Sequence, residues 1–159
     1  MAELKDLKLA KATFETLCKA LDNNKWNYKK DEENLTVKCG ARGDDLPMDL
    51  VIEVDAERMV VILLSQIPFV FKEDKRIDAA IAVSAINNIL AHGCFDYDVI
   101  SGKMLFRMTN SFVDSKLGEE VFIYMLLASC KTVDDFNDKL LMLAKGMLSI
   151  EQFLSTLTN

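Results

Sequence analysis

The segment RIDAAIAVSAINNILAHGCFDYDVISGKMLFRM, residues 76–108, decides the fold of this 159-residue chain. Residues 76–91 predict one helix, because isoleucine, valine and alanine recur three and four positions apart around more than half of its circumference. The remaining strip carries small or neutral polar residues instead of the lysine and glutamate of a solvated face. We therefore expect this helix to be buried along most of its perimeter and to end at Gly93.

The residues after this helix predict a β-hairpin that turns at Ser101 and Gly102. Counting outward from the turn gives three apolar pairs on one face, Phe95 with Met108, Tyr97 with Phe106, and Val99 with Met104. The opposite face pairs Asp96 with Arg107, Asp98 with Leu105, and Ile100 with Lys103. Since pairing and alternation agree, the hairpin has one face toward the core and one polar face.

Four further strands are predicted before the long helix. Residues 26–30 and 35–42 form a hairpin around the turn 31–34, which sets Trp26 opposite Cys39 and Tyr28 opposite Val37. Residues 48–55 alternate strictly between apolar and polar. Residues 59–66, MVVILLSQ, are apolar on both faces, which indicates a central strand or one whose second side is covered.

The remaining segments predict helices. Residues 3–21 are amphipathic, and residues 116–130 are strongly apolar. Thr132 with Asp135 predicts the start of a third helix over 133–145 that Gly146 ends, and Ser149 with Gln152 caps a short fourth. The fold class is therefore α+β. We expect a single domain over 1–159, in which an antiparallel sheet of about six strands carries a long central helix, an N-terminal helix and C-terminal helices, in the order α-ββββ-α-ββ-ααα.

Composition limits the partners that we expect. A net charge of −6 argues against nucleic acid, because phosphate binding needs a positive field, and it favours a basic or amphipathic protein partner. No apolar run approaches the length that spans a membrane. The charged N-terminus does not read as a signal peptide, and four scattered cysteines are expected to be reduced thiols, so we expect a cytoplasmic protein.

Catalytic, metal and cofactor sites are not predicted. His92 is the single histidine, and its position just past the long helix favours a structural role near the helix C-terminus. The acidic residues Glu73, Asp74 and Asp78 lack the spacing of a calcium loop. The sequence therefore favours a protein without enzymatic activity.

Two groups of side chains are candidates for partner binding. The first is an apolar patch on the strand face opposite the main core, which the first helix, the C-terminal helices or a second copy must cover. The second is the polar face of the hairpin, which binds cationic groups of a partner or is simply solvated. The candidate residues are Val51, Val60, Ile62, Leu64, Asp96, Asp98 and Arg107.

With these elements in place, the chain resembles the YbjN family, whose fold is similar to that of the type III secretion chaperones. The resemblance rests on the segment order and on residues 79–108, and it covers roughly residues 4–143. Its motifs are the Ile86-Asn87 pair, Gly93-x-Phe95-x-Tyr97 and Gly102-x-Met104-x-Phe106-Arg107. It implies a small bacterial cytoplasmic protein, often dimeric and without enzymatic activity, that holds extended segments of other proteins. The extra strand and the additional C-terminal helices depart from the chaperone plan.

Three hypotheses for the function follow. The leading one is a non-enzymatic protein-binding or regulatory module of chaperone-like type that associates through the second sheet face or the helix 116–130, with a protein, a peptide or a second copy. The alternative is a small-molecule sensor or enzyme with a pocket between the long helix and the second hairpin, near Ser84, Asn87 and Asn88. The third is a subunit of a larger assembly.

Overall fold

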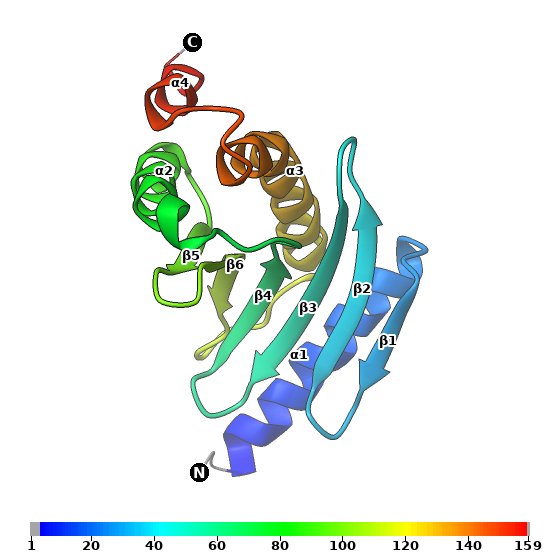
Figure 1. Ribbon diagram of the computed structural model, residues 1–159. Coiled ribbons are helices and arrows are strands. Elements are labelled where there is room, and N and C mark those ends of the chain that lie inside the picture. The colour runs from blue at the N-terminus through cyan, green and yellow to red at the C-terminus, as the bar shows by residue number, and fades with distance from the viewer. Residues whose placement is uncertain (1–3, 159) are drawn as a thin grey trace.

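The computed structural model describes residues 4–158, which form one α+β unit (Figure 1). The helices are α1 (Leu4–Asn23), α2 (Arg76–Ile89), α3 (Glu119–Ala144) and α4 (Ile150–Ser155), with a short 3-10 turn at Glu73–Lys75. The strands are β1 (Tyr28–Asp31), β2 (Thr36–Arg42), β3 (Pro47–Asp55), β4 (Val60–Gln66), β5 (Cys94–Asp98) and β6 (Lys103–Ser111). They form one antiparallel sheet in the order β1-β2-β3-β4-β6-β5, which confirms the predicted class and strand number.

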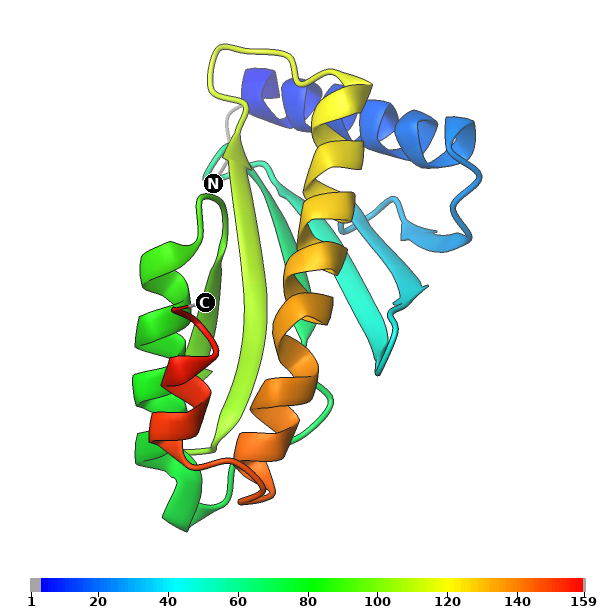
Figure 2. The ribbon, with the colours of Figure 1, turned by 90° about the horizontal axis from the view of Figure 1, so that it is seen from above.

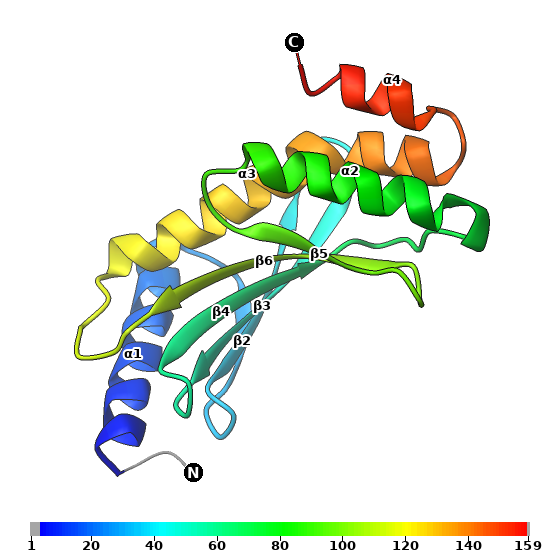
Figure 3. The same cartoon turned by 90° about the vertical axis from the view of Figure 1, so that its left-hand side faces the viewer.

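The α-helices of the described chain lie on one face of the sheet (Figure 3). Figure 1 looks onto the other face, with α1 and α3 passing behind the strands. The predicted alternation explains this layering, because Met48, Leu50, Ile52 and Val54 of β3 all point toward the helices and are buried. On β4 the core positions are Val61, Leu63 and Ser65.

The long helix of the sequence prediction, α2, lies beside the edge strand β5 and not over the sheet centre. It buries Ala79, Ala82, Val83 and Ile86. The prediction that most of its perimeter is buried is wrong, because its outer isoleucines are exposed: Ile77 at 67%, Ile81 at 42% and Ile89 at 53%. Its position at the edge leaves one side of the helix without a neighbouring layer. It also ends earlier than predicted, since Leu90 is already extended.

The helix over the sheet centre is α3, which packs on β4, β6 and α1 (Figure 2). The predicted break between residues 130 and 133 is wrong, since α3 continues for 26 residues. Its buried stripe passes through the proposed break from Ser129 to Val133 and Asn137, so packing overrides the local capping signal. The predicted C-terminal features are confirmed. Gly146 has φ 70° and ends α3, and Ser149 and Gln152 form the capping box of α4.

Both hairpins have the predicted faces but different pairs. Phe95 lies opposite Phe106 and Tyr97 opposite Met104, so the predicted pairing is wrong by two residues. The cause is a longer turn, which takes in Val99 and Ile100 and which Asp98 stabilises by accepting from the backbone N–H of Ile100 (2.9 Å) and the Ser101 hydroxyl (2.6 Å). The first hairpin is also shifted by two residues, with Tyr28 opposite Cys39, but its turn keeps the predicted four residues and lies one position later, at 32–35. A shift of two residues keeps every side chain on its predicted face.

Candidate functional site

The sheet face opposite the helices, which we call the open face, contains all the residues predicted to bind a partner. The register places Val51, Leu64 and Arg107 side by side on β3, β4 and β6. Ile62 and Val60 continue along β4, and Asp96 and Asp98 lie on β5 beyond β6. The four aliphatic candidates are partly exposed, and no helix covers them within residues 4–158. The sequence predicted two separate groups, and the structure joins them into one surface.

A groove of about 470 Å³ crosses the open face, and we call it the sheet groove. Val51, Leu64 and Leu105 line its base, and the segment 67–70 forms one wall. Val70 on this wall is 50% exposed. The wall is tied to the second hairpin, because the N–H of Ile67 donates to the carbonyl of Met104 (3.0 Å) and that of Phe71 to the carbonyl of Gly102 (2.9 Å). The groove therefore has an apolar base and a wall held by backbone hydrogen bonds.

Sequence reasoning missed Leu105 and the wall residues. Leu105 lies on the hairpin face predicted to be polar, and residues 67–71 fall between the predicted strand 59–66 and the predicted helix 76–91. The signal that could have found them is the apolar character of IPFVF directly after a strand that is apolar on both faces. A second depression of about 400 Å³ adjoins the sheet groove through Gln66 and Leu105 and extends to Asp96 and Asp98.

The polar end of the open face is organised around Arg107. Its Nε donates to Asp96 Oδ2 (2.6 Å) and its Nη2 to Asp96 Oδ1 (3.1 Å), a bidentate pair. The Arg107 guanidinium holds the pKa of Asp96 below its usual range. Hydrogen bonds from Ser101 and from the backbone N–H of Ile100 likewise lower the pKa of Asp98. Both carboxylates are therefore ionised at neutral pH, and Asp96 is already neutralised by its partner.

Replacing Arg107 by glutamine is expected to raise the pKa of Asp96 toward its ordinary value, because the ionised form loses its charged donor. The folded pKa of Asp96 now lies below the unfolded one. The pair therefore stabilises the protein above the unfolded pKa, and this contribution is lost as the pH falls through the folded pKa. Since both side chains are 42% exposed, we expect a loss of less than about 1 kcal/mol at neutral pH.

Carboxyl carbon NMR titration of Asp96 measures this shift. Lys103→Gln is the matched control, since Lys103 lies opposite Asp98 on the same face and makes no contact with Asp96 among the described hydrogen bonds and ion pairs. An Asp96 pKa that is the same in the Arg107 variant as in the parent protein would contradict the assigned pair.

Other groups that carry chemistry are held in structural contacts. The His92 ring lies edge-on to Tyr124 at 5.7 Å between centroids. Burial raises the pKa of the Cys39 thiol to about 11, and it also raises the pKa of Cys18, Cys94 and Cys130, so these thiols are protonated at neutral pH. Among residues 4–158 no cluster of three or more histidine, cysteine, aspartate or glutamate side chains is arranged to hold a metal ion. Over the same residues no helix is long and apolar enough to cross a membrane.

The prediction of a pocket between the long helix and the second hairpin is wrong, because side chains fill that place. The Asn87 side chain bonds the backbone of Phe95 there, and Val83, Ile86 and Phe95 are buried. Ser84 and Asn88 point instead into a shallow groove of about 890 Å³, which Leu154 of α4 also lines. Ser84 and Asn88 therefore face away from the hairpin, whereas Asn87 bonds to it.

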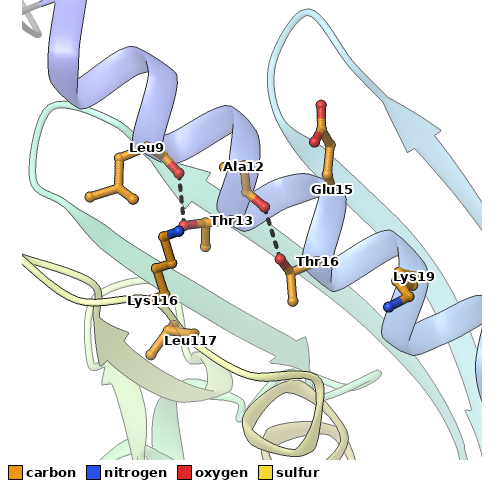
Figure 4. A pocket seen from close by; sticks show the side chains of 8 residues that line it. All are labelled: Leu9, Ala12, Thr13, Glu15, Thr16, Lys19, Lys116 and Leu117. Carbon is orange, nitrogen blue, oxygen red and sulfur yellow. Dashed lines mark hydrogen bonds between the residues drawn. The ribbon is translucent and has the colours of Figure 1, made fainter.

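A smaller pocket of about 320 Å³ lies between α1 and the loop before α3 (Figure 4). Its hydroxyl groups are used within the helix, because Thr13 donates to the carbonyl of Leu9 and Thr16 to that of Ala12, both at 2.9 Å. Lys19 at its end forms an ion pair with Glu119 at 2.8 Å. These groups serve the packing of α1 and do not converge on a ligand position.

Comparison with known proteins finds no matching family model and no matching curated protein. The fold is similar to solved structures. YbjN from E. coli, described as a candidate transcription regulator, has 14% identity and a TM-score of 0.57 over 79% of this chain and 92% of that chain. A chain of the ExsC–ExsE complex has 14% identity and a TM-score of 0.55, covering 83% and 96%. A chain of the HopA1–SchA chaperone–effector complex has 14% identity and a TM-score of 0.52, covering 85% and 96%. The chain thus has a YbjN-like fold that is also the fold of type III secretion chaperones.

Proposed function

We propose that this chain is a non-enzymatic, chaperone-like module that holds an apolar segment of another protein on the open face of its sheet. The observation that carries the proposal is the aliphatic surface of Val51, Val60, Ile62, Leu64 and Leu105, which lies on a sheet face without a helix in the described chain. Apolar surface of this kind marks protein interaction sites. Similarity of fold to chains of a chaperone–effector complex supports the same class of function.

Charge indicates the kind of segment. The chain carries a net charge of −6, which favours a cationic partner over nucleic acid. Asp49 lies at the rim of the sheet groove, and Asp98 lies at the far end of the adjoining depression. We therefore propose as occupant a segment of another protein in which leucine, isoleucine or phenylalanine is flanked by lysine or arginine. All four cysteines are free thiols, which suits a reducing compartment, and we propose that the protein acts in the bacterial cytoplasm.

Binding of short synthetic peptides tests this function. We expect peptides that combine leucine or phenylalanine with lysine or arginine to bind, and versions with glutamate in place of the basic residues to bind more weakly. Hydrogen exchange of the complex should show protection in β3, β4, β6 and the segment 67–71. Peptides that bind but protect α2 and α4 instead would contradict the site, and the absence of binding by any apolar peptide would contradict the function.

A second copy of the chain is the competing occupant of the open face. Sedimentation of the purified protein over a range of concentrations distinguishes the two cases. A monomer that binds peptide on the open face supports the proposed function. A dimer whose open face is protected from exchange without peptide would make this face a self-interface, and peptide binding would then have to compete with dimerisation.

A further inference from the structure

The backbone of the edge strand β5 is hydrogen-bonded by the side chain of Asn87, which takes the place of a neighbouring strand at one residue. The Asn87 amide nitrogen donates to the carbonyl oxygen of Phe95 at 2.9 Å, and the N–H of Phe95 donates to the Asn87 Oδ1 at 2.8 Å. One side chain of α2 thus satisfies both backbone groups of one residue in the edge strand. This is the same pair of hydrogen bonds that a neighbouring strand would make.

The register of β5 shows that these groups point away from the sheet. Phe95 lies opposite Phe106, and since its N–H and carbonyl bond to Asn87, they do not bond to β6. In an antiparallel pair the backbone groups of alternate residues point outward, so Phe95 and Tyr97 supply the outward groups of β5. Because the backbone groups of Phe95 are bonded to Asn87, only those of Tyr97, beside the turn, remain open to an added strand within β5. One residue is too few for an added strand to form a ladder of hydrogen bonds.

The other edge of the sheet is protected by different means. β1 has four residues, and Lys29 and Lys30 within it are exposed. Short edge strands with lysine discourage pairing between sheets. β5 has five residues and carries the carboxylates of Asp96 and Asp98 on the open face, whereas its Phe95 and Tyr97 side chains are not exposed. The Asn87 contact adds to this charge by occupying the outward backbone groups of Phe95 themselves.

We propose that Asn87 closes the β5 edge against strand addition, so that partner segments bind on the open face and copies of the chain do not pair edge to edge. The residue type is specific, because the site requires one donor and one acceptor on a short side chain. Aspartate keeps the acceptor for the Phe95 N–H but loses the donor. Alanine loses both.

Variants of Asn87 test the proposal, with a synthetic peptide that copies β6, residues 103–111, as the probe strand. In Asn87→Ala we expect the Phe95 amide to exchange faster, the protein to self-associate with rising concentration, and the probe to bind at least about tenfold more tightly than to the parent protein, since each lost hydrogen bond is worth about 1 kcal/mol. Asn87→Asp should keep the protection of the Phe95 amide from exchange and should self-associate less than Asn87→Ala. Asn88→Ala, one position along on the exposed side of α2, is the matched control and should behave as the parent protein.

The result that overturns the proposal is an Asn87→Ala protein that stays folded by circular dichroism, exchanges the Phe95 amide faster, and neither self-associates nor binds the probe. If Asn87→Ala does not fold, Asn87→Asp decides. In Asn87→Asp the carbonyl oxygen of Phe95 has no hydrogen-bond donor from α2 and is free to pair with an added strand. Probe binding above the parent level therefore supports the edge role, and binding at the parent level refutes it. Because the probe also carries the apolar and basic residues expected to bind on the open face, its binding is compared in proteins that additionally carry Leu64→Lys, so that a difference between Asn87 variants reports the β5 edge alone.

Discussion

Replacing Gly102 by alanine is expected to lower the free energy of unfolding by about 2–5 kcal/mol. Gly102 has φ +73°, a left-handed conformation that costs an alanine about 1–2 kcal/mol. An added Cβ would also lie 2.1 Å from the carbonyl oxygen of Phe71. This oxygen belongs to backbone that is bonded to the same glycine, because the Phe71 N–H donates to the Gly102 carbonyl at 2.9 Å. Relief of the clash must therefore break that bond and move the hairpin away from the segment 67–71.

Denaturant unfolding of Gly102→Ala and of a matched Gly40→Ala control measures the effect. At Gly40 an added Cβ would meet the carbonyl oxygen of Met48 at 3.6 Å, an ordinary contact, so we expect a change of less than about 1 kcal/mol there. Because the neighbouring residues 67–70 form a wall of the sheet groove, Gly102→Ala should also weaken peptide binding. Equal stability of the two variants would contradict the close approach of the turn to Phe71.

The faces of the strands could be predicted from the sequence, and their partners could not. Alternation alone fixes which side of β3 is buried, and the two-residue error in both hairpins left every face unchanged. Pairing depends on both the length and the position of each turn, and the first turn is one position later than predicted, at 32–35. At the second turn the Asp98 side chain bonds to Ile100 and Ser101 and holds four residues out of the ladder, an arrangement that a residue count cannot show.

The roles of the helices were assigned incorrectly because apolar content does not give position. α2 is rich in isoleucine, yet Ile77 and Ile81 are exposed beside the sheet edge. α3 occupies the centre and continues through a Thr132–Asp135 pattern that resembles a helix start. Local signals of this kind identify a favourable cap, but a helix continues wherever the buried stripe continues.

The candidate site was predicted in its parts. The apolar outer side of β3 and β4 and the polar side of the second hairpin are both visible in the sequence. Their union depends on β6 lying next to β4, which is a property of the strand order. The Asn87 contact was missed for a related reason, since a polar residue on an apolar helix gives no indication that its partner is backbone in an edge strand.

Replacing Leu64 by lysine is expected to weaken peptide binding at least about 100-fold while leaving the fold intact. Leu64 lies at the centre of the open face, between Val51 and Arg107, and it lines the base of the sheet groove. Its side chain is partly exposed, so the free protein can keep a lysine ammonium in water. The complex cannot, because a bound segment would cover the position. Loss of a buried leucine contact costs about 1.5–3 kcal/mol, and placing a charge against apolar or cationic groups of the peptide adds to that loss.

Leu127→Lys is the matched control for this variant, because Leu127 is 57% exposed on α3 in the helical layer, on the other side of the sheet. Both variants add one positive charge to a chain of net charge −6, so any general effect of charge on a basic peptide is the same in the two proteins. Fluorescence titration with one labelled apolar and basic peptide, together with thermal unfolding, separates binding from folding. Loss of binding in Leu64→Lys alone locates the segment on the open face. Equal affinities in the two variants would place the partner elsewhere, because a side chain at the base of an occupied groove cannot change from leucine to lysine without a cost in affinity.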